Sequence, residues 1–362
     1  MTTLTVLSAV VVALGSIAAG LAGLAKHTSA TYRQVQLRRS RKRSSLALDG
    51  VVEAERQVRR PHVPSNLPAM REFIGRKREI GLVEQALRSR AHILVIDGIG
   101  GAGKTSLALE VAHSLLHKGD TVEENSHEFN AAVWIQCNNG ESALPILFAM
   151  VARVLDYPGI GKLELTAQRG AIERLLHEAK CLIILDNYVP ANSIVALSFL
   201  RSLSGNTKVL ITSRTQVAEA DWALSLGGLA EQECVHLILS EGRRLNIAAI
   251  EGAPPAMLAD LVRATGGMPL GVRWAVSQVK QRGQTLDGVL SLLASAKGDM
   301  FATMFDRSWA VLSKRSRRVL LTFTLLPYPL SRRAVEAGSG VRRERLDDCL
   351  GQLVELSLVL QS

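Results

Sequence analysis

Between residues 73 and 228 the sequence alternates between short apolar runs and segments whose apolar residues recur every three or four positions. The runs have the length of buried strands, and the intervening segments have the spacing of helices with one apolar face. Strands that are apolar along their whole length indicate a parallel sheet covered on both sides by helices. The pattern therefore predicts an α/β fold, carried by the runs HILVID at 92–97, AAVWIQC at 131–137, CLIILD at 181–186 and KVLITS at 208–213.

The first apolar run leads into Gly98-Ile-Gly-Gly-Ala-Gly-Lys104-Thr105, and a helical pattern follows. A glycine-rich turn between a strand and a helix exposes backbone N–H groups to an anion, and the start of the helix adds unsatisfied donors and its positive dipole. In such a turn Lys104 reaches the β- and γ-phosphates of a nucleotide, and the Thr105 hydroxyl is a ligand for Mg²⁺. The segment therefore predicts a nucleoside triphosphate site.

The same turn also satisfies the dinucleotide pattern G-x-G-x-x-G, through Gly98, Gly100 and Gly103. Two observations favour the triphosphate. Lys and Thr directly follow the last glycine, and the next predicted strand, AAVWIQC, does not end in an acidic residue that could hold a ribose. We therefore expect a phosphate loop of the NTPase type.

Two of the later runs end in residues that suit a triphosphate. Asp186 ends CLIILD, where a carboxylate can hold Mg²⁺ through water, and Arg214 follows KVLITS, where a guanidinium can contact a γ-phosphate. Both would lie at the carboxyl edge of a parallel sheet, which is where ligands bind. The alternatives are an ordinary turn aspartate and an arginine that caps a neighbouring helix.

The N-terminal segment has a different character, because Leu4 to Ala25 contains no charged side chain. As a helix, these 22 residues would extend about 33 Å, enough to cross a bilayer. A secretory signal is less favoured because no basic residue precedes the run, and a buried core helix is the other alternative. Because the basic cluster RRSRKR at 38–43 follows the span, the positive-inside rule predicts an outside N-terminus and a cytoplasmic globular part.

The net charge of +10 is unevenly distributed. Residues 26–60 contain ten Lys or Arg and three Asp or Glu, a net charge of +7, so residues 61–362 carry only +3. The excess is typical of a juxtamembrane linker, and the globular part has little charge with which to attract nucleic acid. The four cysteines lie far apart without a C-x-x-C pair, which indicates reduced core residues and excludes a disulfide framework or zinc site.

Five motifs in order resemble the NB-ARC nucleotide-binding module of STAND signal-transduction NTPases, a branch related to AAA+ ATPases. They are FIGRKRE from residue 73, the phosphate loop, LIILDN, KVLITSR, and GGMPL from residue 266. The resemblance implies a P-loop domain with a parallel sheet flanked by helices, followed by a helical subdomain and a winged-helix subdomain. The expected boundaries are 1–25 for the transmembrane helix, 26–68 for the basic linker, 69–228 for the P-loop domain, 229–300 for the helical subdomain and 301–362 for the winged helix.

The resemblance also implies ATP or ADP with Mg²⁺ as the cofactors. Segment 74–76 would border the adenine and ribose, and the proline of GGMPL would pack against the adenine from the helical subdomain. The residues expected to hold the nucleotide are Ile74, Gly75, Arg76, Gly98, Gly100, Gly101, Ala102, Gly103, Lys104, Thr105, Ser106 and Pro269. Those expected to take part in any chemistry are Lys104, Asp186 and Arg214, with Thr105 and, through water, Asp186 as the Mg²⁺ ligands.

The sequence departs from the family pattern at Asn187, where a second acid usually follows Asp186. A carboxamide cannot accept a proton from an attacking water, so nucleotide binding is implied more strongly than hydrolysis, and whether the chain is an enzyme stays open. The family's β-phosphate-reading histidine and ligand-sensing repeats would lie beyond residue 362. We therefore expect either a fragment or truncated product, or a separate chain that senses the signal.

These inferences favour a membrane-anchored ATP/ADP-binding switch whose nucleotide exchange controls conformation and self-association, with a separate sensor or effector as partner. The alternative is a DNA-binding ATPase or transcription regulator that uses the winged helix. In that alternative Lys314, Arg315, Arg317 and Arg318 would form a basic patch, although a solvated helix face explains them equally simply. A third interpretation is a degenerate remnant without activity.

Overall fold

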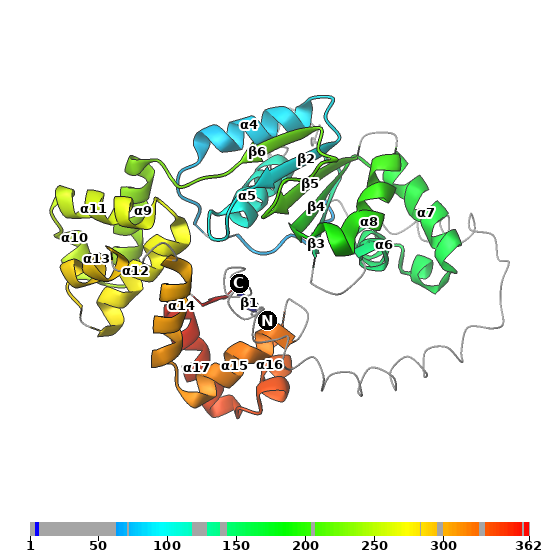
Figure 1. The fold of residues 1–362 in the computed structure, drawn as a ribbon. Coiled ribbons are helices and arrows are strands. Elements are labelled where there is room, and N and C mark those ends of the chain that lie inside the picture. The colour runs from blue at the N-terminus through cyan, green and yellow to red at the C-terminus, as the bar shows by residue number, and fades with distance from the viewer. Residues whose placement is uncertain are drawn as a thin grey trace.

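The computed structural model describes residues 4–6, 63–70, 72–117, 129–137, 143–203, 207–282, 284–294, 300–325, 330–356 and 358–361. Three parts follow one another along the chain (Figure 1). A sheet with helices on both sides comes first, a purely helical part follows at one end of it, and the C-terminal helices form a third part below.

The first part contains a five-stranded parallel sheet with the order β3-β4-β5-β2-β6 (Figure 1). Its strands are β2 (Ile93–Asp97), β3 (Ala131–Gln136), β4 (Cys181–Tyr188), β5 (Lys208–Ser213) and β6 (Trp222–Ser225). Four of them confirm the four predicted runs, whereas β6 is an addition. Because β5 lies between β2 and β4, the glycine-rich turn and the predicted aspartate lie two strands apart.

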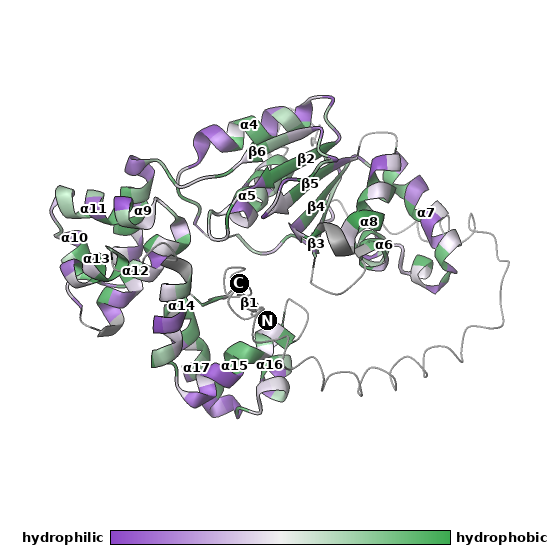
Figure 2. Ribbon diagram, in the orientation of Figure 1, coloured by the Kyte–Doolittle hydropathy of each residue, from purple (hydrophilic) through white to green (hydrophobic). Residues whose placement is uncertain are grey.

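Helices cover both faces of the sheet because the strands are apolar on both faces (Figure 2). The helices are α4 (Lys77–Arg88), α5 (Lys104–His117), α6 (Ala143–Val154), α7 (Leu165–Glu178) and α8 (Pro190–Ser202). Ile183 of β4 packs with α6, α7 and α8, and the next residue, Ile184, packs with α4 and α5. Successive strand residues therefore supply two separate cores, as expected from the two-residue period of a strand.

Residues 64–66, which were expected in the linker, lie along the free edge of β3. The backbone N–H of Ala132 donates to the carbonyl of Pro64 at 3.1 Å. The Asn66 side chain donates to the Trp134 carbonyl at 2.9 Å and accepts from the Trp134 N–H at 2.7 Å. Asn66 thus pairs with β3 much as a strand would, and the sheet edge is covered. The packed part of the chain therefore begins ahead of residue 69.

The helical part has a core of its own, separate from the sheet. Its helices are α9 (Glu231–Arg244), α10 (Ala248–Glu251), α11 (Pro255–Thr265), α12 (Pro269–Arg282) and α13 (Leu286–Ala294). Leu237, Leu261 and Trp274 are buried in that core. The position of α12 matters most for the site, because its first residues face the phosphate loop.

The C-terminal part contains α14 (Met300–Val311), α15 (Lys314–Leu325), α16 (Arg332–Ser339), α17 (Arg343–Glu355) and β7 (Val359–Gln361). Phe323 and Leu353 lie in its core. The buried indole of Trp274 in α12 donates a hydrogen bond to the buried Ser308 hydroxyl in α14 at 2.9 Å. This contact joins the C-terminal part to the helical part.

The N-terminal strand β1 (Leu4–Val6) pairs antiparallel with β7, with Thr5 opposite Leu360. The prediction that a transmembrane helix begins at Leu4 is therefore wrong for these three residues, whose backbone pairs with a distant strand. The rest of that predicted span, 7–25, and the linker up to residue 62 lie outside the described residues. Among the helices that the structure does describe, none combines the length and apolar character needed to cross a membrane.

Candidate functional site

The phosphate loop follows β2 directly and ends where α5 begins. Its first residue, Gly98, has φ +139°, and a Cβ at this position would lie 2.4 Å from the carbonyl oxygen of Leu226. That carbonyl is fixed because the Leu226 N–H donates to the Asp97 carbonyl at 2.8 Å. No side chain fits between the loop and the segment after β6, so the first glycine of the motif is required by packing as well as by backbone angle.

The side chain of Lys104, the first residue of α5, extends back over this loop. Its Nζ donates to the carbonyls of Gly98 at 2.7 Å and Ile99 at 2.8 Å. The pKa of Lys104 is lowered from 10.5 to about 8, mainly by burial and also by the nearby charge of Arg214, while Asp186 and Asp97 oppose the shift. An ammonium group held by neutral carbonyls and destabilised by a second cation is suited to receive an anion. The predicted lysine and arginine therefore converge on one place.

Asp186 lies in β4 with its carboxylate against α5. The Thr105 hydroxyl donates to Asp186 Oδ1 at 2.7 Å, and the Thr212 hydroxyl of β5 donates to the same oxygen at 2.6 Å. Burial raises the pKa of Asp186, while these two hydrogen bonds and the charge of Lys104 act in the opposite direction. The two residues predicted to serve Mg²⁺ are thus in direct contact, although they are 81 positions apart in the sequence.

Asn187 has a left-handed backbone, with φ 55°, and its N–H donates to the Thr212 hydroxyl at 2.9 Å. Asparagine tolerates this conformation better than most residues. The hydrogen bond to Thr212 therefore gives the Asn187 N–H a partner just after Asp186 in β4. The Asn187 carboxamide cannot act as a base.

Three residues of this site have no counterpart among the predicted ones. Thr212 holds the carboxylate, and Ser225 of β6 donates to the Asp97 carboxylate at 2.7 Å. The negative charge of Asp97 in turn favours the charged form of Lys104 and opposes the lowering of its pKa. Thr212 and Asp97 stand at the ends of predicted strands, so their positions could have indicated a role; Ser225 belongs to the strand that was not predicted.

The helical part touches the phosphate loop through the start of α12. The N–H of Leu270 donates to the Gly101 carbonyl at 3.3 Å, and a Cβ at Gly103 would lie 3.9 Å from the ring of Pro269. Pro269 is thus beside the phosphate loop, and its packing against an adenine stays a prediction. Ile74 packs partly buried against the core of the helical part.

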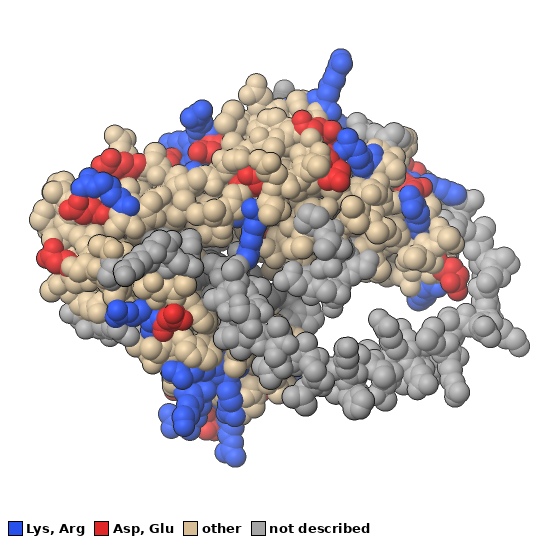
Figure 3. Space-filling model, in the orientation of Figure 1, with Lys and Arg blue, Asp and Glu red and all other residues tan. Residues whose placement is uncertain are grey.

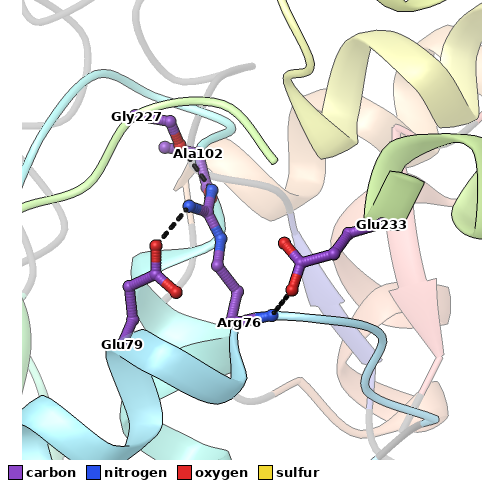
Figure 4. Close-up of polar contacts among 5 residues, drawn as sticks. All are labelled: Arg76, Glu79, Ala102, Gly227 and Glu233. Carbon is purple, nitrogen blue, oxygen red and sulfur yellow. Dashed lines mark hydrogen bonds and ion pairs between the residues drawn. The ribbon is translucent and has the colours of Figure 1, made fainter. Parts of the chain in front are cut away.

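The remaining predicted residues divide between the loop and its surroundings. Gly100, Gly101, Ala102 and Gly103 form the loop, and Thr105 and Ser106 are in the first turn of α5 with exposed side chains. Gly75 and Arg76 precede α4. The Arg76 side chain is buried and hydrogen-bonds to the protein (Figure 4), so segment 74–76 is tied to the loop mainly through this side chain.

The donor set fits Mg²⁺, a hard cation that prefers oxygen and keeps several waters. A threonine hydroxyl and a buried carboxylate meet at the carboxyl edge of the sheet, beside an ammonium group that a phosphate would approach. In the described part of the chain no group of three His, Cys, Asp or Glu residues could bind a metal by itself. Nucleotide oxygens and water would have to supply the other ligands.

Comparison with known proteins relates part of this chain to one family of domains. Residues 76–240 match the NB-ARC domain. The match runs from Arg76 through the phosphate loop and all five strands of the parallel sheet into α9. It supports the resemblance drawn from the motifs in this part of the chain, and it ends before the GGMPL motif at residue 266.

Two relatives extend the comparison beyond the NB-ARC domain. The transcription activator GutR of Bacillus subtilis (strain 168) is 23% identical over 326 residues, which are 82% of this chain and 38% of GutR. The structure of a STAND protein with a tetratricopeptide repeat sensor from Pyrococcus horikoshii aligns with a TM-score of 0.51 and 17% identity, over 80% of this chain and 40% of that one. The structural likeness shows the P-loop NTPase fold. The chain spans about two fifths of the length of each relative.

Proposed function

We propose that the NB-ARC domain of this chain binds ATP and ADP and acts as a signalling switch of the STAND type. The observation that carries the proposal is the convergence of Lys104, Thr105, Asp186 and Arg214 at the carboxyl edge of the sheet. These groups come from one helix, one strand and the residue that follows a second strand, and together they match the charge of a triphosphate with its cation.

Each group has a distinct task in this proposal. The amides of the phosphate loop and Lys104 bind the β- and γ-phosphates, while Arg214 contacts the γ-phosphate and so distinguishes ATP from ADP. Thr105 would bind Mg²⁺ directly and Asp186 through water; the ion neutralises phosphate charge when bound. Ile74 and Pro269 border the adenine.

Hydrolysis is slow or absent in this proposal. The residue after Asp186 is Asn187, whose side chain cannot take a proton from water. The switch therefore depends on exchange of the nucleotide. ADP holds the helical part on the phosphate loop, as the contacts of Leu270 and Pro269 do in this structure, and Mg-ATP favours an open form that self-associates. Exchange shifts the populations only if the two nucleotides bind the two forms with different affinities.

The proposal is tested by the nucleotide that the purified full-length chain carries and by its mass in solution. We expect mass spectrometry of the denatured protein to find ADP, and light scattering to show a larger species after exchange into Mg-ATP. A chain that carries no nucleotide and binds none when ADP is added would contradict the proposal. If the chain binds nucleotide but its mass in solution does not change, the proposal is reduced to nucleotide binding without self-association.

Membrane attachment is a further part of the proposal. Its support is the uncharged sequence from residue 7 to residue 25 and the basic cluster that follows it, which favour a single span with the NB-ARC domain in the cytoplasm. Sedimentation of the full-length chain with membranes tests the attachment, and release by an alkaline wash would contradict it.

DNA binding is the second candidate function, and three observations favour it. Residues 340–342 join α16 to α17 as a three-residue turn with Gly340 in a left-handed conformation, as in a helix-turn-helix. Basic side chains gather over the C-terminal helices (Figure 3), and Lys314, Arg315 and Arg318 of α15 are exposed. The relative GutR is described as a transcription activator.

This candidate is distinguished from the switch by titration of the full-length chain with duplex DNA at several salt concentrations. If α15 contacts phosphates, replacing Arg315 and Arg318 by Glu weakens binding and reduces the salt slope by about one unit per lost contact. The same replacement at the exposed Arg78 of α4 serves as the control. Binding that is weak and equal in all three proteins would remove this candidate.

A further inference from the structure

Arg76 lies where four segments of the chain meet (Figure 4). Its backbone N–H donates to Glu233 Oε1 at 2.7 Å. Its guanidinium forms an ion pair with Glu79 at 3.3 Å and donates to the carbonyls of Ala102, at 3.4 Å, and Gly227. With 5% of its surface exposed, Arg76 is buried among these partners.

These contacts join parts of the molecule that are otherwise separate. Ala102 belongs to the phosphate loop, and Gly227 belongs to the connection between β6 and the helical part. Glu233 is in the first turn of α9, the first helix of the helical part. One residue therefore links the nucleotide site, the connection and the part of the protein that rests on the site.

The turn at Gly75 brings the backbone of Arg76 against Glu233. Gly75 has φ +77°, and a Cβ there would lie 2.8 Å from Glu233 Cδ, so the carboxylate occupies the space of a side chain. Arg76 itself has φ 61°, a left-handed conformation that is unfavourable for a residue other than glycine. Such a conformation persists only where the surrounding contacts hold it.

Backbone hydrogen bonds also hold the helical part against the phosphate loop at a second place. The Leu229 N–H donates to the Gly267 carbonyl at 2.9 Å, and the Leu270 N–H donates to the Gly101 carbonyl at 3.3 Å. The connection, α12 and the phosphate loop thus form one continuous set of backbone contacts. Movement of the helical part away from the loop would break the contacts at Gly101, and it would also separate Glu233 from Arg76.

We propose that Arg76 and Glu233 form a latch that keeps the helical part seated on the phosphate loop and thereby slows release of a bound nucleotide. Arg76 acts here as a positioning residue: its guanidinium holds the loop and the connection together, and its backbone holds Glu233. The latch rests on the proposed function, because it regulates the same nucleotide site. When the helical part moves away, Arg76 loses Glu233 and keeps Glu79 of α4, the helix that follows it.

The test is the release rate of a fluorescent ADP analogue from the full-length chain, followed after mixing with excess unlabelled ADP. Glu233→Ala removes the acceptor, and we expect release to become about tenfold faster, the effect of losing one hydrogen bond to a charged group. Glu233→Gln keeps an acceptor oxygen and should restore most of the slow release. Glu231→Ala, an exposed acid in the same turn of α9, controls for loss of charge at the helix start.

A latch changes release while leaving association and folding nearly unaltered. We therefore expect the association rate constant and the thermal unfolding midpoint of the nucleotide-free Glu233→Ala protein to stay close to the wild-type values. The latch would be overturned if Glu233→Ala released the analogue at the wild-type rate. It would also be overturned if Glu231→Ala released the analogue as fast as Glu233→Ala does. Arg76→Lys provides a second variant, which keeps the charge but lacks the guanidinium fork, and it should also release faster. If the wild-type chain itself fails to bind the analogue, the proposed function fails, independently of the latch.

Discussion

Replacing Lys104 by Ala is expected to weaken the binding of ATP and ADP by about 100-fold or more. The ammonium group lies in a buried loop and is the charged partner of the β- and γ-phosphates. Removal of one partner of a buried charge pair costs about 2–5 kcal/mol. Calorimetric titration of the full-length chain measures the change, and the exposed Lys162→Ala provides a matched control. Unchanged affinity in Lys104→Ala would refute the assignment of the site.

The pH dependence of binding gives this prediction a second readout. The pKa of Lys104 is lowered to about 8 in the nucleotide-free protein, and a phosphate beside it favours the charged form. Because the charged fraction of free Lys104 falls about tenfold between pH 7 and pH 9, affinity for ADP should fall by up to about tenfold over that range. The Lys104→Ala variant should lack this fall. An equal fall in both proteins would assign the pH dependence to another group.

Replacing Asp186 by Asn is expected to remove most of the gain in ATP affinity that Mg²⁺ provides. Asp186 would hold the ion through water, and loss of such an outer ligand typically lowers metal affinity by about 10- to 100-fold. The amide has the size of the carboxylate and retains an oxygen that can accept from Thr105 and Thr212, so the loop should keep its shape. Titrations with ATP in the presence of Mg²⁺ and in the presence of a chelator measure the difference.

The same variant should be at least as stable as the wild-type protein at pH 7. Burial raises the pKa of Asp186, which means that the folded state disfavours its charge, and a neutral amide avoids that desolvation cost. Thermal unfolding without nucleotide measures the effect, with the exposed Asp156→Asn as control. A Mg²⁺ effect that persists undiminished in Asp186→Asn would show that the carboxylate does not serve the ion.

The apolar runs and the glycine loop were predictable from the sequence because their signals are local. β2 and β5 each contain an unbroken apolar run, and the loop is recognised from adjacent residues. β6 escaped detection because its four residues alternate between half-buried and exposed and include only three apolar side chains. It forms because its backbone pairs with β2, from Leu94 opposite Trp222 to Asp97 opposite Ser225. No pattern within residues 222–225 specifies that partner.

The prediction for the N-terminus was partly wrong for a related reason. An uncharged segment satisfies the requirement for a membrane helix, but Leu4–Val6 also satisfies that for a strand, and the partner at Val359–Gln361 lies at the other end of the chain. The arginine of the FIGR motif shows the same limit. Its sequence context placed it beside the adenine and ribose, which stays a prediction, and gave no sign that its guanidinium hydrogen-bonds to the carbonyls of Ala102 and Gly227.

The sequence by itself determined the class of fold, the phosphate loop and the carboxylate and arginine that accompany it, because each depends on residues adjacent in the chain or on a regular period. Only the tertiary structure decided that β5 lies between β2 and β4, that Thr212 joins Asp186 to Asn187, and that Arg76 meets Glu233. These features depend on contacts between segments far apart in the sequence. Such contacts are selected by the packing of the whole domain, since the energy of any one pairing depends on which other segments bring its two members together.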